Sequence, residues 1–277
     1  MNERNLSTRS KTLLLQGLTA LFAMLCWNTL WANAAPITIG VVPQFRSVEI
    51  RERWAPIAKE IEAATGRKAV IKYSKDIPSF EKQFQAGEFD IIYANPYHMV
   101  VANQTQGYLP IIHDHSKQLT GILVVRKDSG ITEMSQLDNQ PMAFPAPNAL
   151  GASLLMRTEL ATEHKLTIKP RYVKTHSNVY LAVLAGQVKA GGGVMRTLRQ
   201  MTERQQADLE VFYTTQKVNP HPIAVHPRVS APIASQIQQA LLAKPALLKD
   251  VPMAQPGAST FADYAKLSTM GLEKFAE

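Results

Sequence analysis

The chain of 277 residues contains a single cysteine, Cys26, so a disulfide within the chain is excluded. Aromatic residues make up 7% and charged residues 19%, whereas hydrophobic residues make up 45%. Disordered, collagen-like and coiled-coil proteins have different compositions. Acidic residues are outnumbered by basic ones, 22 to 30, but no dense run of Lys and Arg favours a nucleic-acid partner. The composition indicates a globular protein with one large domain or two smaller ones.

The first 34 residues are predicted to be a removable export signal. A basic start, an apolar stretch over residues 13–31 and the small-residue triplet Ala32-Asn33-Ala34 follow one another. This order is typical of a signal peptide and its cleavage site. We expect cleavage after Ala34 and a mature protein in an exported compartment.

Two alternatives for this segment depend on single residues. A membrane anchor is disfavoured because polar residues such as Gln16 and Asn28 interrupt the apolar stretch. A lipoprotein would be acylated at Cys26, but the preceding Leu25 is too bulky for that processing site. Cleavage after Ala34 removes the only cysteine, which excludes cysteine nucleophiles and cysteine-ligated metals from the mature protein.

Apolar runs alternate with helically spaced apolar residues along the mature chain. Continuous apolar runs indicate buried strands, and Gly or Pro residues end the helical patterns. This alternation predicts parallel sheets covered by helices. The expected strands are 37–43, 69–73, 90–94, 120–125, 142–144, 171–174, 209–214 and 223–225, and the expected helices are 54–65, 80–86, 152–164, 177–185 and 197–206.

The pattern starts afresh near residue 119, which predicts an α/β protein of two lobes around a cleft. Lobe one is expected to contain residues 36–118 plus the largely helical segment 226–277, and lobe two residues 119–225. Two crossover strands would join the lobes and form a hinge. Ligands bind beyond the carboxyl ends of parallel strands, so the loops of interest are 43–47, 95–98, 145–151, 175–178 and 191–196.

Several stretches carry a resemblance to a known family. They are residues 39–43, residues 89–97, residues 123–131, Ala143-Phe144, and His176 with the helix after it. In these stretches the chain resembles the periplasmic phosphate/phosphite/phosphonate-binding proteins of ABC transporters. The resemblance implies a two-lobed periplasmic binding protein that captures a small oxyanion in the periplasm for an ABC permease. We also expect a monomer that needs no cofactor and has no enzymatic activity. A periplasmic partner of a membrane histidine kinase or cyclase, with the same fold, is the alternative.

The resemblance also implies a ligand site, which this chain changes. It aligns the family's hydroxyl-rich phosphonate loop with residues 146–151, where no hydroxyl is present. The backbone amides before the helix at Ala152 remain available to an anion. His176 matches a ligand position of the family. Arg196 and His221 fall where some members hold a substrate amine with acidic residues, and Arg196 would instead repel an amine and pair with a second acidic group.

The loop residues themselves allow structural roles as well as ligand contact. Tyr93 ends a strand and could belong to the core, and Asn95 could satisfy a turn. Asn148 could cap a helix, and Arg196 could face solvent although the glycine run before it lets a ligand approach closely. The candidate ligand-binding residues are Phe45, Arg46, Tyr93, Asn95, Tyr97, Asn148, Ala149, Leu150, Gly151, His176, Arg196 and His221.

Two other functional classes have weaker support. The triplet His113-Asp114-His115 and His98 offer metal-ligand side chains, but an isolated His-X-His predicts a metal receptor poorly, and the triplet is expected in a loop. The sequence lacks the Gly-X-Ser-X-Gly, His-Glu-X-X-His and phosphate-loop motifs of common enzymes. Neither catalysis nor a bound metal is therefore expected.

Overall fold

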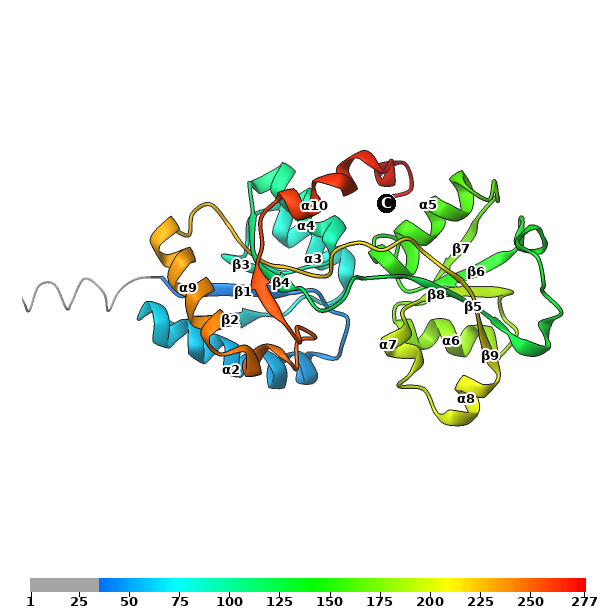
Figure 1. Cartoon of the computed structure of the whole chain (residues 1–277), viewed down its shortest axis with the longest axis horizontal. Coiled ribbons are helices and arrows are strands. Elements are labelled where there is room, and N and C mark those ends of the chain that lie inside the picture. The colour runs from blue at the N-terminus through cyan, green and yellow to red at the C-terminus, as the bar shows by residue number, and fades with distance from the viewer. Residues whose placement is uncertain (1–34) are drawn as a thin grey trace, which may run out of the picture.

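Residues 35–277 are described by the computed structural model, so the predicted export segment and its cleavage after Ala34 lie outside the described residues. Two sheets with flanking helices form two lobes, as Figure 1 shows. Between residues 35 and 277 no helix combines the length and the apolar character needed to cross a membrane. The predicted two-lobed α/β class is confirmed.

Lobe one is built on a six-stranded sheet with the strand order β11-β4-β10-β3-β1-β2. The strands β1, β2 and β3 are parallel, and β10 and β11 add antiparallel pairs. The strands are β1 (Ile37–Val41), β2 (Ala69–Lys72), β3 (Ile91–Tyr93), β4 (Leu109–Asp114), β10 (Ile223–Val225) and β11 (Pro256–Ala258). The helices are α2 (Ser47–Thr65), α3 (Ile77–Gln85), α4 (Pro96–Gln106), α9 (Ala231–Ala243) and α10 (Ala262–Ala265), with the short helices η4 (Pro245–Leu248), η5 (Lys266–Thr269) and η6 (Leu272–Lys274).

Lobe two is built on a five-stranded mixed sheet with the order β7-β6-β8-β5-β9. Its strands are β5 (Ile122–Arg126), β6 (Pro141–Phe144), β7 (Lys169–Tyr172), β8 (Ala190–Gly193) and β9 (Leu209–Thr214). Its helices are η1 (Lys127–Ser129), η2 (Met134–Leu137), η3 (Leu150–Leu154), α5 (Leu155–Thr162), α6 (His176–Leu184), α7 (Met195–Leu198) and α8 (Glu203–Ala207).

Local sequence signals set the ends of the helices that reach the cleft. Asn95 caps α4, and its side-chain oxygen accepts a hydrogen bond from the His98 amide at 2.8 Å. Pro96 is the first residue of α4, and Gly107 ends it in the left-handed conformation. Thr175 caps α6 in the same way as Asn95 caps α4. The caps at Asn95 and Thr175 fix where the loops at the cleft end and the helices begin.

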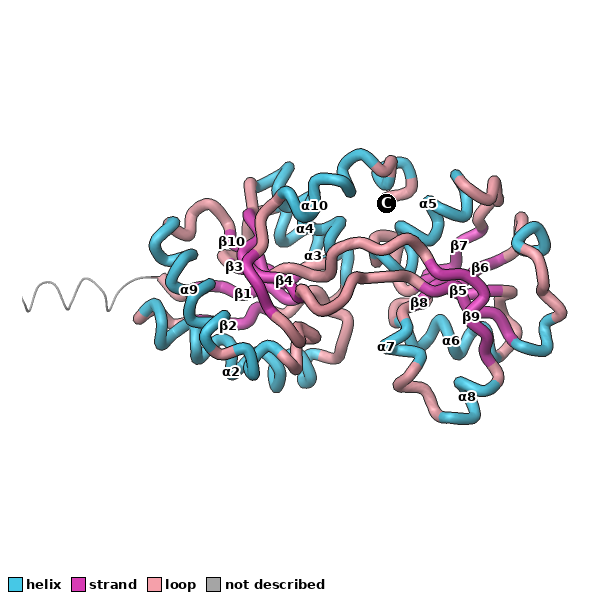
Figure 2. The backbone as a smooth tube through the Cα atoms, in the orientation of Figure 1, coloured by secondary structure: helices cyan, strands magenta, loops and turns pink. Residues whose placement is uncertain are grey.

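The two passages of chain between the lobes lie side by side (Figure 2). Leu119 and Val218 form an antiparallel bridge whose two N–O distances are 2.8 and 3.0 Å. The boundary expected at residues 225 and 226 needs one correction. The prediction placed Ile223–Val225 in lobe two, but this strand pairs with β3 and β4 inside the lobe-one sheet. The exact limits of the two lobes otherwise stay a prediction.

Three other expectations from the sequence were wrong. The glycine run was expected in a loop, but Gly191–Gly193 lie in β8 at the centre of the lobe-two sheet. The single helix expected over 197–206 is divided into the short helices α7 and α8. The helix expected from Ala152 starts earlier, with the π-helical turn η3.

The glycines of β8 are needed because helices pack directly against the strand. A methyl group on Gly193 would come within 2.1 Å of the Tyr180 hydroxyl oxygen. On Gly192 it would come within 2.0 Å of the Ala152 carbonyl oxygen and 2.7 Å of the Phe144 ring. The glycines therefore make room for protein atoms rather than for a ligand, which corrects the sequence-based interpretation.

We expect Gly192→Ala to destabilise the protein by about 3 kcal/mol, because overpacking a close contact forces backbone shifts. Gly130→Ala is the control, since Gly130 has φ +68° with open space around it. Its left-handed backbone should cost only about 1 kcal/mol. Urea unfolding measures both values, and equal losses for the two variants would contradict the packing argument.

The C-terminal segment packs on lobe one and then crosses to lobe two, as the red ribbon in Figure 1 shows. Leu267 and Leu272 are buried in the lobe-one core.

The end of the segment that crosses to lobe two is held by Arg157 of α5. The Arg157 guanidinium donates to the Phe275 carbonyl at 2.7 Å and to the Pro147 carbonyl at 3.0 Å. Arg157 is only 4% exposed and also pairs with the Glu277 carboxylate at 3.3 Å. The backbone of Glu277 exchanges two hydrogen bonds with the Asn148 side chain.

Replacing Arg157 with methionine should lower the free energy of unfolding by about 2–4 kcal/mol, because two partly buried carbonyls lose their charged donor. Arg171→Met is a matched control, since the exposed Arg171 makes one hydrogen bond, to the Gln187 carbonyl at 3.3 Å. Chemical unfolding with hydrogen exchange of residues 266–277 would locate the effect. A loss no larger than that of Arg171→Met would show that the crossing contact contributes little.

Candidate ligand-binding cleft

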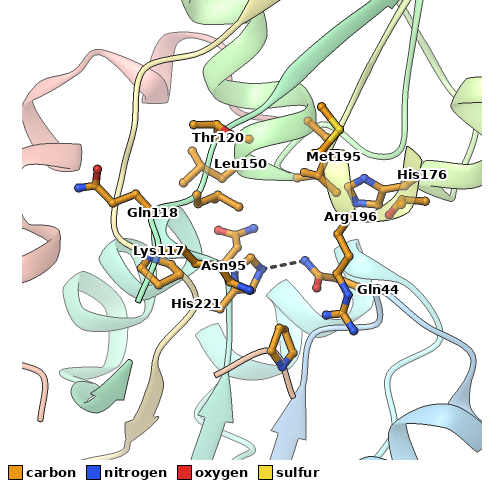
Figure 3. Close-up of a pocket in the computed structure, with 18 of the residues that line it drawn as sticks. Gln44, Asn95, Lys117, Gln118, Thr120, Leu150, His176, Met195, Arg196 and His221 are labelled. Carbon is orange, nitrogen blue, oxygen red and sulfur yellow. Dashed lines mark hydrogen bonds between the residues drawn. The ribbon is translucent and has the colours of Figure 1, made fainter. Parts of the chain in front are cut away.

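A cavity of about 570 Å³ lies between the two sheets (Figure 3). Lobe one contributes the loop after β1, the end of β3 and the segment after η4. Lobe two contributes η3 and the starts of α6 and α7, and both crossover passages complete the wall. The cavity therefore lies where carboxyl ends of parallel strands are expected to bind a ligand.

The lobe-two wall presents the first turn of a helix to the cavity. Ala149, Leu150, Gly151 and Ala152 line it. The backbone of Gly121 in the crossover packs closely against this turn. A methyl group added to Gly121 would come within 1.8 Å of the Gly151 carbonyl oxygen. The first amides of a helix have no partner within the helix. They carry the positive end of the helix dipole, which suits an anion.

His176 begins α6 and lines the cavity beside this turn. Its Nδ1 atom is buried and has no hydrogen-bond partner among residues 35–277. Burial lowers the pKa of His176 to about 4. The imidazole is therefore neutral near pH 7 and offers one nitrogen to a ligand.

His221 on the returning crossover is held by lobe one. Its Nε2 lies 2.8 Å from the Gln44 side-chain nitrogen, and its ring stacks on Tyr93 with centroids 5.4 Å apart. Burial, then the neighbouring His98, His176 and Arg196, lower the pKa of His221 to about 3. Burial raises the pKa of Tyr93, whose hydroxyl donates to the Val251 carbonyl at 3.4 Å. Both side chains are uncharged at neutral pH.

Arg196 on α7 reaches from lobe two to lobe one. Its guanidinium carbon lies 5.2 Å from the centre of the Phe45 ring, in the loop after β1. Arg53 lies over the same ring at 4.3 Å. Burial, and then the charge of Arg53, lower the pKa of Arg196 from its ordinary value. A ring thus holds the guanidinium where no carboxylate of residues 35–277 pairs with it.

The charged side chains of the cavity wall are all positive. Four cationic side chains line it, and no Asp or Glu of the described chain does. None of the four makes an ion pair with residues 35–277. A cleft lined by one sign of charge concentrates the opposite ion. The four side chains are Lys117, Arg196, Arg199 and Lys249.

Most of the predicted site residues meet at this cavity. Asn95 also donates a hydrogen bond to the Asn148 carbonyl at 2.9 Å, so its side-chain amide joins the two lobes. Contact between these site residues and a ligand stays a prediction. The predicted residues that line the cavity are Phe45, Tyr93, Asn95, Ala149, Leu150, Gly151, His176, Arg196 and His221.

Three predicted residues do not line the cavity. Arg46 is exposed and pairs with Glu49 at 2.8 Å. Tyr97 packs against the lobe-one core from the first turn of α4. Asn148 is buried, and its side chain bonds to the backbone of Glu277. In each case the side chain for which the sequence predicted ligand contact makes a contact within the protein instead.

Other lining residues were missed because only loops after strands were inspected. Lys117, Gln118 and Thr120 lie on the first crossover, immediately before β5. The predicted hinge at residue 119 was a signal for them, since a hinge passage borders the cleft. Lys249 and Pro252 come from the C-terminal segment, for which the sequence gives no such signal.

The histidines considered as metal ligands contact other protein groups. His113 lies within β4 rather than in a loop, and its ring stacks on His115 with centroids 4.2 Å apart. His98 lies 2.9 Å from the Glu81 carboxylate. Among residues 35–277, no three His, Cys, Asp or Glu side chains gather in a way that could hold a metal ion.

The fold and the cleft define a two-lobed solute-binding protein. The family model of the periplasmic substrate-binding protein of phosphonate ABC transporters matches residues 39–263. The chain belongs to this family, which confirms the resemblance found in the sequence and places the protein with periplasmic partners of ABC permeases. No curated protein matches the chain.

Solved structures show the same fold at low sequence identity. The methylphosphonate complex of PhnD1 from Prochlorococcus marinus is 14% identical, with a TM-score of 0.74 over 86% of this chain and 97% of that one. A binding-protein component of an ABC phosphonate transporter from Pseudomonas aeruginosa is 14% identical, with a TM-score of 0.74 over 87% of each chain. A Xanthomonas citri protein bound to ATP is 16% identical, with a TM-score of 0.73 over 88% and 100%.

The lowered pKa values of the two cleft histidines predict that the folded protein loses stability on acidification. Unfolded histidine has a pKa of about 6.5, above the values of about 4 and about 3 for His176 and His221. As pH falls from about 6.5 toward 4, the unfolded chain binds protons that the folded protein does not, and the free energy of unfolding falls. The contribution stops growing once the folded histidines titrate.

The measurement is the melting temperature between pH 7 and pH 4, without ligand. The double variant His176→Asn/His221→Asn should lose less stability over this range than the unchanged protein. Carboxylates titrate equally in both proteins, so the difference isolates the histidines. Identical pH profiles would contradict the lowered pKa values.

Proposed function

We propose that the protein binds a small oxyanion of the phosphonate class in this cleft and delivers it to an ABC permease. The observation that carries the proposal is the cavity wall, with four cationic side chains and no carboxylate of residues 35–277. The start of a buried helix faces the same space. Both features attract a small anion through charge and hydrogen bonding.

In the proposed complex, the phosphonate oxygens accept hydrogen bonds from the amides of Gly151 and Ala152. The neutral His176 donates or accepts one hydrogen bond beside them. Gln44 and Asn95 approach from lobe one, so closure of the lobes surrounds the anion. Each charge-assisted hydrogen bond typically contributes about 1.5–3 kcal/mol.

The structural relatives support the ligand class. The Prochlorococcus marinus protein holds methylphosphonate, and the Xanthomonas citri protein holds ATP, so both ligands carry phosphorus oxyanions. The family model describes a transporter component, which favours delivery to a permease over a kinase or cyclase sensor.

We further propose that the protein acts without turnover or cofactor, as a monomer, after cleavage behind Ala34. Neither His176 nor His221 is hydrogen-bonded to a hydroxyl group among residues 35–277. A nucleophile activated by a base is therefore not assembled at the described wall. Both histidines are also too weakly basic to accept a proton near pH 7.

A thermal-shift screen tests the ligand class. Methylphosphonate, phosphate, phosphite and sulfate would be compared with neutral and cationic compounds. A ligand at about 100 times its dissociation constant stabilises the folded protein by about 2.7 kcal/mol. Stabilisation by neutral or cationic compounds alone would overturn the proposal.

Lys117→Glu tests the charge of the cleft. Reversing this charge should weaken methylphosphonate binding by about fivefold to tenfold at low salt. Lys59→Glu is the matched control, because Lys59 is an exposed residue of α2 outside the cavity. Calorimetric titration of both variants checks the result. Equal affinity in Lys117→Glu and Lys59→Glu would show that cavity charge does not attract the ligand.

A further inference from the structure

Arg196 is a cation that the described protein leaves without an anionic partner. Its guanidinium has no hydrogen bond and no ion pair within residues 35–277, and its recorded contact is the Phe45 ring at 5.2 Å. Arg53, on the same ring, is compensated by Glu49 at 3.6 Å. Arg196 is exposed to the open cleft, so the N–H donors of its guanidinium are available to an anionic ligand.

The guanidinium of Arg196 is separate from the helix turn that suits the phosphonate group. In Figure 3 the Arg196 side chain extends toward Gln44, whereas Leu150 and Thr120 lie on the opposite side of the cavity. His176 lies near the base of Arg196. The volume of about 570 Å³ also exceeds what one phosphonate group fills, since one water molecule occupies about 30 Å³. The cavity therefore has two places for negative charge.

The same wall disfavours an amine. An ammonium group is stabilised by carboxylates or by an aromatic face. The described lining offers no carboxylate, and two guanidinium groups already lie over the Phe45 ring. The neighbouring His221 and His176 remain neutral, and the four cations of the wall repel a fifth.

From this geometry we infer that the ligand carries a second anionic group and no amine, and that Arg196 determines this specificity. The inference rests on the proposed function, because it assumes a phosphorus oxyanion at the helix turn. Arg196 donates two parallel hydrogen bonds to the second group, such as a carboxylate. The bound group then contacts lobe two through Arg196 and approaches lobe one at Phe45.

Three ligands with the same two-carbon chain on phosphorus test the inference. They are 3-phosphonopropionate, propylphosphonate and 2-aminoethylphosphonate, which end in an anion, a methyl group and a cation. By calorimetric titration, 3-phosphonopropionate should bind about 10- to 100-fold more tightly than propylphosphonate. The aminated ligand should bind more weakly than propylphosphonate.

Arg196→Gln should abolish most of the preference for the carboxylate while affecting propylphosphonate much less. Arg51→Gln, an exposed residue of α2 outside the cavity, is the matched control and should keep the preference. Melting temperatures verify that both variants fold. Phosphoglycolate has an oxygen atom where 3-phosphonopropionate has the carbon bonded to phosphorus. Comparing the two ligands therefore shows whether the cleft prefers a phosphate ester or a phosphonate.

The outcomes separate the two hypotheses. Equal binding of 3-phosphonopropionate and propylphosphonate, or tightest binding of 2-aminoethylphosphonate, overturns the inference and leaves the phosphonate function intact. A preference that survives in Arg196→Gln overturns the role of Arg196. If none of the three phosphonates binds, the proposed function fails. Binding of phosphoglycolate alone, lost in Arg196→Gln, supports two-anion recognition but replaces phosphonate by phosphate ester.

Discussion

The pairing of the two crossover passages is the constraint on which the cleft depends. Leu119 and Val218 exchange two backbone hydrogen bonds, and Gly121 receives another from the Thr215 amide at 3.0 Å. Gly121 also presses on Gly151, where no side chain fits between the two backbones. The hinge thereby sets the position of the helix turn that faces the cavity. The candidate site and the paired crossover passages therefore share this contact.

The lobes are also joined on the side of the C-terminal segment. Arg157 and Asn148 of lobe two hold Phe275 and Glu277, whose preceding residues are anchored in the lobe-one core. Asn95 adds a direct bond between the lobes. A rotation of the lobes that separated Asn95 from Asn148 would break this bond. Asn95 lines the cavity, so the contact between the lobes lies next to the candidate site.

The sequence predicted the two-lobed architecture well because buried strands and capped helices leave local signals. The glycines after the expected helices, such as Gly66 after α2, are such signals, whereas the start of α4 at Asn95 and Pro96 was missed because a loop was expected there. The errors arise where distant contacts decide the structure. Gly191–Gly193 form a strand because α6 and η3 pack on it, and Ile223–Val225 enter the other sheet through pairing with β3 and β4. Likewise Asn148 faces Glu277, 129 residues away in sequence.

Unpaired charge in the cleft gives ligand binding its physical basis. Arg196 is exposed, and partial burial together with the charge of Arg53 lowers its pKa from the ordinary value. The neutral Phe45 ring supports the guanidinium without neutralising it. An intramolecular carboxylate would pair with Arg196 and weaken its attraction for an anion. Because Arg196 belongs to lobe two and the Phe45 ring that it contacts belongs to lobe one, an anion bound at Arg196 would lie at the junction of the two lobes.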